Sequence, residues 1–348
     1  MRGTPTRRLV LRRGAVALRW EVRTVAVAAG LAVALVMGAT CAVLLLGDYP
    51  IAPADAVRAV LGQGADPLAV YFVQEQRLPR VVCAILVGAA LAASGSIIQT
   101  LTGNPLGSPD VIGFTTGSAT GALVMIVLVG SGPGMVGVAA VVGGLAVAAL
   151  VVRLTRRGGM SGFRLVLVGL GVGLILEALN TLLVVRASLA SAQDAAQWLA
   201  GSLNATGWSD VAVIGVALAL LLPPAVVLAR PLEVLRAGDE LAGGLGVGVL
   251  RVRRAALVVG VALVAVATAV CGPIAFVALA APQLARRLTW TGGLGLGTSC
   301  LVGAALVLAS DAVAQRLFAP TQLAVGVVTG CLGGVYLIWL LVIEGRRA

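Results

Sequence analysis

Lysine and histidine are absent from this 348-residue chain, so every one of its 25 basic residues is an arginine. Without histidine the chain has no imidazole general base and no Ser-His-Asp triad. Without lysine it has no phosphate-binding loop of the Gly-x-x-x-x-Gly-Lys type. We therefore expect the chain to be no enzyme, to hydrolyse no ATP itself and to bind no cofactor directly.

Charge is also scarce. Charged residues make up 11% of the chain and hydrophobic residues 59%, with a mean hydropathy of +1.06. Soluble domains carry about 25% charged residues, so this composition indicates a polytopic membrane protein. The cysteines stand singly in apolar stretches, without metal-ligand spacing, and predict no metal site; they are Cys41, Cys83, Cys271, Cys300 and Cys331.

Long apolar runs recur along the chain, and a helix needs about 20 such residues to cross a bilayer. The runs predict an all-α fold of about ten transmembrane helices, in which the eighth is short and contains Pro282. The predicted spans are Thr24–Leu46, Pro79–Leu101, Ile112–Val129, Met135–Val152, Leu165–Val185, Val211–Leu228, Ala255–Cys271, Ile274–Leu284, Leu294–Ala314 and Leu323–Ile343.

The arginines are distributed unevenly between the two sides of this topology. If the N-terminus is cytoplasmic, 20 arginines lie in cytoplasmic segments and 5 lie outside. This agrees with the positive-inside rule and places both termini in the cytoplasm. We expect residues 1–23 to form a basic cytoplasmic segment and residues 24–348 to form the membrane domain. The first apolar run is too long for a signal peptide.

Arg77-Leu78-Pro79-Arg80 precedes the second span and puts two arginines on the outer side, against the positive-inside trend. They are either interfacial anchors or a docking point for carboxylates of an external partner, because the guanidinium fork matches a carboxylate.

Residues 236–246 lie in the longest internal cytoplasmic loop. A short helix here would present Leu241 and Leu245 on one side, four residues apart, for a soluble partner; a solvated loop is the alternative.

In the fifth span, Glu177 lies near Asn180 and Thr181. A carboxylate at that depth faces a cavity or holds a neighbouring helix by a hydrogen bond.

These segments, in this order and spacing, resemble the permease family of iron-siderophore, haem and cobalamin ABC importers, which is FecCD-type and BtuC-like. The resemblance runs from about residue 70 to about residue 343. Besides Arg77-Leu78-Pro79-Arg80, the matching stretches are Gly88–Gly95, Asn104–Pro109, Gly238–Gly246, Gly272–Val277 and Pro320–Gly330.

The resemblance implies a type II ABC importer permease in the inner membrane of a bacterium. Such a permease pairs with a second permease chain, here expected to be a different one. Two ATP-binding subunits, which hold the ATP and Mg, lie beneath the pair, and a substrate-binding protein docks outside. The runs Phe163–Gly169 and Trp198–Asn204 are most similar to the siderophore branch, which often uses two different permease chains. A ferric siderophore is the expected cargo.

The resemblance also assigns roles to individual residues. The ATPase-coupling loop comprises Gly238, Asp239, Glu240, Leu241, Ala242, Leu245 and Gly246; the docking residues are Arg77, Arg80 and Arg316; the translocation pathway includes Glu177, Asn180 and Thr181. Several positions depart from the family pattern: Gly103 stands in place of an arginine, Gly107 in place of an alanine, and Ala324 and Val335 in place of prolines. Two further departures concern the site residues. Gln315 stands where the third docking arginine is usual, with Arg316 next to it, and Gln283 replaces a histidine.

Three other functions compete with a siderophore permease. A cobalamin or haem permease would have the same motifs. An ion-coupled secondary transporter would need ionisable groups in the membrane, and Glu177 and Asp311 are candidates, but no inverted repeat is visible. A membrane enzyme is disfavoured, because no nucleophile and base are paired in any motif.

Overall fold

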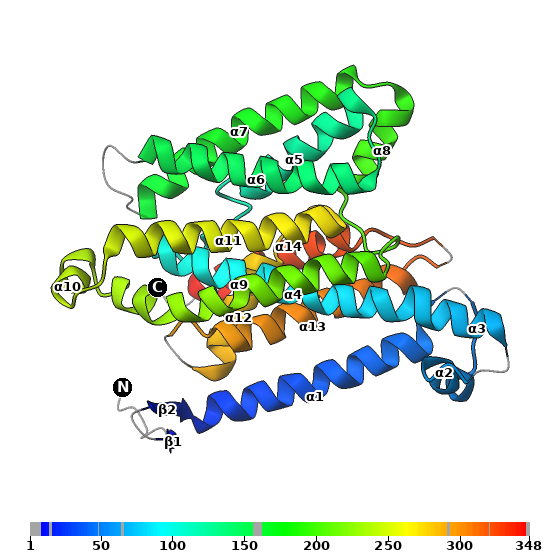
Figure 1. Ribbon diagram of the computed structural model, residues 1–348, viewed down its shortest axis with the longest axis horizontal. Coiled ribbons are helices and arrows are strands. Elements are labelled where there is room, and N and C mark those ends of the chain that lie inside the picture. The colour runs from blue at the N-terminus through cyan, green and yellow to red at the C-terminus, as the bar shows by residue number, and fades with distance from the viewer. Residues whose placement is uncertain are drawn as a thin grey trace.

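Helices make up nearly all of the computed structural model, which describes residues 8–13, 16–47, 49–63, 66–155, 162–290, 293–319 and 321–345 (Figure 1). The helices at the ten predicted spans are α1 (Val22–Leu45), α4 (Leu78–Thr102), α5 (Phe114–Leu123) with its continuation η2 (Val124–Val129), α6 (Pro133–Thr155), α7 (Gly162–Arg186), α9 (Trp208–Leu235), α11 (Val249–Cys271), α12 (Val277–Thr289), α13 (Leu296–Arg316) and α14 (Val325–Gly345).

The predicted all-α class is confirmed. Seven of the described helices are long and apolar enough to cross a membrane, and Phe114–Val129 and Val325–Ile338 are shorter apolar helices. The eighth predicted span, Ile274–Leu284, corresponds to the 13-residue α12, which continues beyond it to Thr289 with Pro282 in its interior. The helix α9 extends beyond its predicted span into polar sequence and contains three prolines.

Short elements occupy the polar stretches between the spans. They are β1 (Arg8–Arg13), β2 (Val16–Glu21), α2 (Pro53–Val60), α3 (Pro67–Tyr71), the π-helix η1 (Phe72–Arg77), α8 (Leu189–Leu199) and α10 (Asp239–Gly244). The two strands pair antiparallel, with Arg8 opposite Glu21. The sequence of residues 1–23 predicts only a basic segment and not this hairpin.

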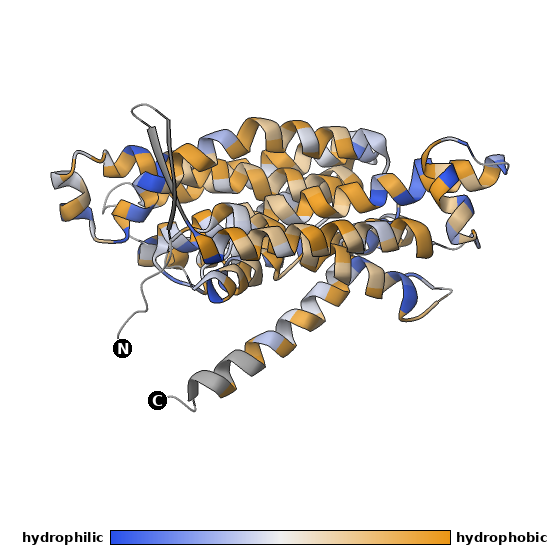
Figure 2. Ribbon diagram, turned by 90° about the horizontal axis from the view of Figure 1, so that it is seen from below, coloured by the Kyte–Doolittle hydropathy of each residue, from blue (hydrophilic) through white to orange (hydrophobic). Residues whose placement is uncertain are grey.

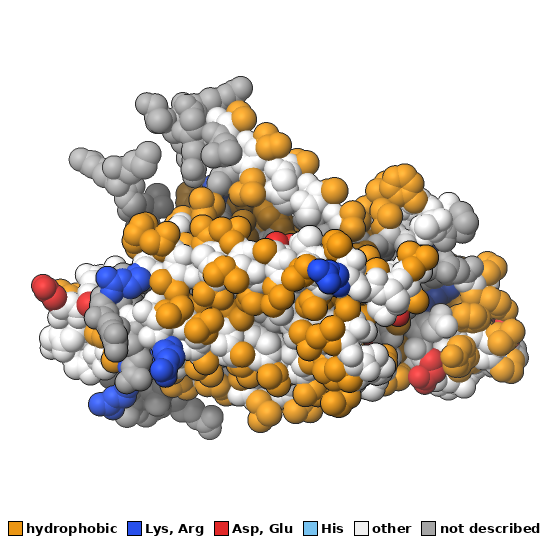
Figure 3. All heavy atoms as spheres, turned by 90° about the horizontal axis from the view of Figure 1, so that it is seen from above, with side chains coloured by type: hydrophobic (Ala, Val, Ile, Leu, Met, Phe, Trp, Pro, Cys, Tyr) orange, Lys and Arg blue, Asp and Glu red, His pale blue; other side chains and the backbone are white. Residues whose placement is uncertain are grey.

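The long helices run side by side, so the molecule has two distinct ends (Figure 1). At one end, here named the α10 end, lie α10, the hairpin β1–β2 and the end of α14. At the other, the α2 end, lie α2, α3 and α8. Apolar residues cover the helices between the ends, and α14 diverges from the bundle toward the C-terminus (Figure 2). In the space-filling view, apolar side chains cover the middle of the face, while several arginines gather toward one end (Figure 3).

The centre of the bundle is α4, which is buried along most of its length and packs against α9, α11, α12 and α13. Glycines permit this close packing. A Cβ atom added at Gly88 would lie 2.4 Å from the carbonyl oxygen of Gly303, and one at Gly95 would lie 1.8 Å from that of Ala278. Small residues at such contacts let membrane helices approach closely.

Gly95→Ala is expected to destabilise the fold by about 3 kcal/mol or more, because α4 and α12 must separate to admit the methyl group. Thermal unfolding and gel filtration in detergent would measure the loss. Gly30→Ala is the matched control, since a Cβ atom there meets nothing within 4 Å. Equal stability of the two variants would contradict the packing of α4 on α12.

Candidate functional site

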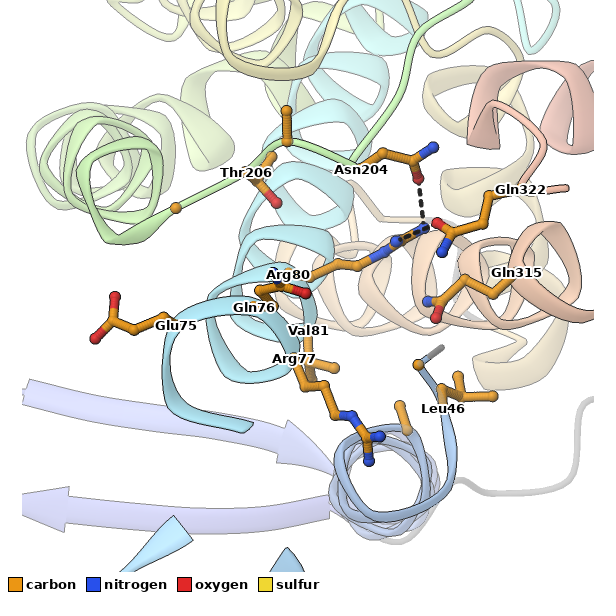
Figure 4. Close-up of a pocket in the computed structure, with 14 residues that line it drawn as sticks. Leu46, Glu75, Gln76, Arg77, Arg80, Val81, Asn204, Thr206, Gln315 and Gln322 are labelled. Carbon is orange, nitrogen blue, oxygen red and sulfur yellow. Dashed lines mark hydrogen bonds between the residues drawn. The ribbon is translucent and has the colours of Figure 1, made fainter. Parts of the chain in front are cut away.

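A cavity of about 580 Å³ opens at the α2 end (Figure 4). Its walls come from the end of α1, from η1 and the first turn of α4, from the segment before α9, from α13 and from the segment before α14. The lining residues are Ala42, Leu46, Gly47, Glu75, Gln76, Arg77, Arg80, Val81, Asn204, Ala205, Thr206, Gly207, Gln315 and Gln322. We name this the α2-end cavity.

The π-helix η1 determines which side chains face the cavity. The N–H of Leu78 donates to the carbonyl of Val73, five residues back. The widened turn is held by Gln74, whose side chain donates to the carbonyl of Ala59 at 3.1 Å and whose own carbonyl accepts from the Trp208 indole at 2.9 Å. Single π-helical turns of this kind are frequent at functional sites.

Arg77 is buried, with 8% of its surface exposed, and holds the end of α1. Its guanidinium donates to the carbonyls of Val43 at 3.2 Å, Leu44 at 3.4 Å and Tyr49 at 2.6 Å. The last carbonyls of a helix lack partners within the helix and form its negative pole, so a cation there is favourable. The side chain of Arg316 donates to the neighbouring carbonyl, that of Leu45.

The segment after α1 is fixed from a second side. The hydroxyl of Tyr49 donates to the carboxylate of Asp66 at 2.9 Å, and this hydrogen bond raises the pKa of Tyr49. Asp66 also accepts from the N–H of Leu68 and so caps α3. The Tyr49 carbonyl is thereby positioned for Arg77.

Arg80 connects three separate parts of the chain. Its Nε and Nη2 donate to the carboxylate of Asp311 at 2.8–3.1 Å, its Nη1 to Gln322 at 2.9 Å and its Nη2 to Asn204 at 2.7 Å. Asp311 is 1% exposed and accepts a further hydrogen bond of 2.7 Å from Gln315. This is a bidentate Arg–carboxylate pair, the strongest type of charge-assisted hydrogen bonding.

The structure therefore brings two of the predicted docking residues, Arg77 and Arg80, to one cavity, and places Arg316 at the neighbouring end of α1. Each is bonded to acceptors of its own chain, and only Arg316 is exposed. Their role in docking stays a prediction. From the sequence, Asp311 is predicted only as an ionisable group in the membrane, and its pairing with Arg80 is not predicted. An aspartate inside an apolar span was the available signal.

The predicted coupling loop lies at the opposite end of the molecule. Gly238 and Gly246 have φ angles of 111° and 82°, which favour glycine, and between them Asp239–Gly244 forms α10. Ala242 is buried against the bundle, whereas Leu241 and Leu245 are 56% and 68% exposed. Asp239 forms a 2.7 Å ion pair with Arg253 of α11, which holds α10 to the bundle.

The predicted pathway residues lie on α7, apart from the α2-end cavity. Glu177 and Thr181 are exposed, and the Thr181 hydroxyl donates to the Glu177 carbonyl at 3.0 Å. Asn180 is buried, and its Oδ1 has no hydrogen-bond partner within the described part of the chain. Leu174 and Ile175 of the same helix are 64% and 71% exposed. Much of α7 is therefore uncovered in the single chain.

Gln283, at the position where the resemblance leads us to expect a histidine, links three elements. Its Nε2 donates to the carbonyl of Pro105 at 2.7 Å, and its Oε1 accepts from Tyr336 of α14 at 3.5 Å. A hydrogen-bonding amide thus occupies the position without adding a group that titrates near neutral pH. Among the described residues, no three His, Cys, Asp or Glu side chains gather as metal ligands would.

Comparison with known proteins identifies the family. The model of the FecCD transport family matches residues 24–343. The ferric enterobactin transport system permease protein FepG of Escherichia coli (strain K12) is 48% identical over 275 residues, which are 79% of this chain and 83% of FepG. The achromobactin transport system permease protein CbrC of Dickeya dadantii (strain 3937) is 37% identical over 337 residues, 96% of each chain.

A solved structure is also similar to this chain. It is a metal-chelate type ABC transporter in an inward-facing conformation, with a TM-score of 0.81 and 28% identity over 92% of this chain and 99% of that one. The match at both levels, sequence and structure, confirms the resemblance carried by the motifs. The chain is therefore a polytopic membrane protein that belongs to the FecCD transport family.

Proposed function

We propose that this chain is the membrane-spanning permease of an ATP-driven importer for ferric siderophores. The observation that carries the proposal is the separation of two unlike surfaces. A polar cavity with arginines opens at the α2 end, and α10 presents exposed leucines at the α10 end. The long helices between them connect the two surfaces mechanically.

In this function α10 contacts an ATP-binding subunit and the α2-end cavity faces an external substrate-binding protein. The α10 end, with both termini, is cytoplasmic, and the membrane is the inner membrane of a bacterium. Two ATP-binding subunits supply the ATP and Mg, so the chain itself catalyses nothing. A second permease, expected to be a different chain, covers the exposed face of α7. Glu177, Asn180 and Thr181 then line the pathway or its wall.

The proposed cargo rests on the functions of the relatives. FepG acts on ferric enterobactin and CbrC on achromobactin. The hemin permease HmuU of Yersinia pestis and the vitamin B12 permease BtuC of Salmonella schwarzengrund (strain CVM19633) are also similar to this chain. They are 35% and 34% identical to it, against 37% for CbrC. A ferric siderophore is therefore the favoured cargo, and haem and cobalamin are the alternatives.

Liposomes that hold the chain with its second permease, ATPase and binding protein would test this function. We expect ferric siderophore, but not hemin or cobalamin, to stimulate ATP hydrolysis and to enter the liposomes. Stimulation by hemin or cobalamin alone would reassign the cargo. If the chain binds no ATPase and changes no ATPase turnover, a secondary transporter that uses Glu177 becomes the better hypothesis.

A further inference from the structure

The short helix α2 has three faces of different character. Ala56 and Ala59 are fully buried against the bundle, and Asp55 and Arg58 form an exposed ion pair of 3.5 Å. Between these two faces lie the exposed apolar side chains of Val57, Val60 and, directly after the helix, Leu61. Because each residue advances a helix by about 100°, these three side chains cover an arc of about 100°, and no charged residue interrupts it.

The helix α3, which contacts α2, adds further exposed apolar side chains. Leu68 and Tyr71 are 57% and 54% exposed. The ring of Tyr71 lies edge to face with Phe72, which in turn stacks on Tyr49. Tyrosine has an apolar ring and a polar hydroxyl, so it is favoured where lipid and water meet. We name Val57, Val60, Leu61, Leu68 and Tyr71 the α2–α3 apolar residues.

The length of α1 places α2 at the boundary of the bilayer. At the α10 end of α1, Arg23 donates to the Leu288 carbonyl at 3.0 Å and its guanidinium lies over the ring of Trp290, which is 78% exposed. Tryptophan and arginine mark one membrane boundary there. The 24 residues of α1 rise about 36 Å, against about 30 Å for the hydrocarbon core. The second boundary therefore lies near Leu45, where α1 ends and contacts α2.

The surroundings of α2 favour lipid over a second protein chain. The helix α1 is itself largely exposed, with Val36 and Met37 at 66% and 64%, so α2 adjoins a helix that faces lipid. Both helices lie on the side of the molecule away from α7 (Figure 1). The second permease, which we place on α7, is therefore on the opposite side of the bundle.

We propose that α2 and α3 lie in the membrane–water interface at the α2 end, with the α2–α3 apolar residues inserted among lipid acyl chains. The Asp55–Arg58 pair faces the aqueous side and carries no net charge, so zwitterionic lipid suffices. Gln74 of η1 donates to the Ala59 carbonyl of α2 at 3.1 Å. The interface thereby holds η1, which contributes to the wall of the α2-end cavity, at a fixed level relative to the bilayer.

Spin labels on α2 would test this position. Val57→Cys and Leu61→Cys would be labelled in the reconstituted transporter without a substrate-binding protein, after Cys41 and Cys331, which are exposed, are replaced by serine. Arg58→Cys is the matched control on the same helix. In phosphatidylcholine bilayers we expect the ratio of label collisions with oxygen, which concentrates in lipid, to collisions with a water-soluble nickel chelate to be at least about threefold higher at Val57 and Leu61 than at Arg58. Adding anionic lipid should leave these ratios unchanged.

Two results would overturn the proposal. Equal ratios at all three positions, with free access of the nickel chelate, would mean that water covers these side chains. Exclusion of both oxygen and the chelate from Val57 and Leu61 would mean that protein covers them. Neither result concerns cargo-stimulated ATP hydrolysis, so the proposed function would stand or fall separately.

A label at Leu68→Cys would report whether α2 holds α3 in the interface. Val57→Asp combined with Leu61→Asp should lower the oxygen-to-nickel ratio at this label about twofold or more, because the carboxylates oppose insertion. Arg58→Ala should leave the ratio at Leu68 unchanged. An unchanged ratio in the double aspartate variant would contradict anchoring by α2.

Discussion

Replacing Arg80 with alanine is expected to lower the free energy of unfolding by about 3–5 kcal/mol, the cost typical of breaking a buried ion pair. The change leaves the Asp311 carboxylate 1% exposed, with Gln315 as its remaining side-chain donor. It also releases Asn204 and Gln322, so the segments before α9 and α14 lose their common anchor. Denaturant or thermal unfolding in detergent would measure the effect.

Two further variants separate the buried charge from the other effects of the change. Arg80→Leu combined with Asp311→Leu should recover most of the stability, because no unpaired charge remains. Arg58→Ala breaks an exposed ion pair with Asp55, in which the two side chains are 67% and 58% exposed. This change should lower the free energy of unfolding by at most about 1 kcal/mol. If Arg80→Ala costs no more than Arg58→Ala, Arg80 and Asp311 do not hold these segments together.

Leu241→Glu combined with Leu245→Glu is expected to reduce cargo-stimulated ATP hydrolysis at least about tenfold. These leucines are 56% and 68% exposed, and a bound ATPase subunit would bury them. Burying each leucine side chain contributes about 1.5–3 kcal/mol, and a charge in its place opposes burial. ATP hydrolysis in liposomes and co-purification of the ATPase would measure coupling and assembly separately.

Leu154→Glu is the matched control for this prediction. Leu154 is 55% exposed in the last turn of α6 and lies outside α10. Asp239→Asn tests the attachment of α10, because it weakens the ion pair with Arg253 and keeps both leucines. We expect it to affect hydrolysis less than the leucine variants. Normal cargo-stimulated hydrolysis by the double leucine variant would place the ATPase contact elsewhere.

Much of the fold could be predicted from composition and spacing alone. A bilayer admits backbone only when its polar groups are paired, so long apolar runs in a membrane protein form helices. Each of the ten predicted spans overlaps a helix, and even α12 was recognised although it is short. The order of the short motifs also indicated the family, because several weak matches in the same register rarely occur together.

Details near the ends of the helices could not be predicted in this way. The continuation of α9 through Pro223, Pro224 and Pro231 contradicts the usual effect of proline, and packing against neighbouring helices outweighs it. The hairpin β1–β2 lies in an arginine-rich segment, and this charge predicts a cytoplasmic location but no secondary structure. In the π-helix η1 the backbone hydrogen bond spans five residues instead of the four of an α-helix, which changes the direction in which Glu75 and Arg77 face.

The sequence by itself determined the membrane location, the helical class, the family and the position of α10 between two glycines, because each depends on local composition or short spacing. Only the tertiary structure decided which groups the outer arginines Arg77 and Arg80 bind. The side-chain partners of Arg80 lie 124, 231 and 242 positions away, and the carbonyls that accept from Arg77 in the described part of the chain lie 28–34 positions away. Pairing over such separations depends on how the helices pack, and helical periodicity carries no information about it.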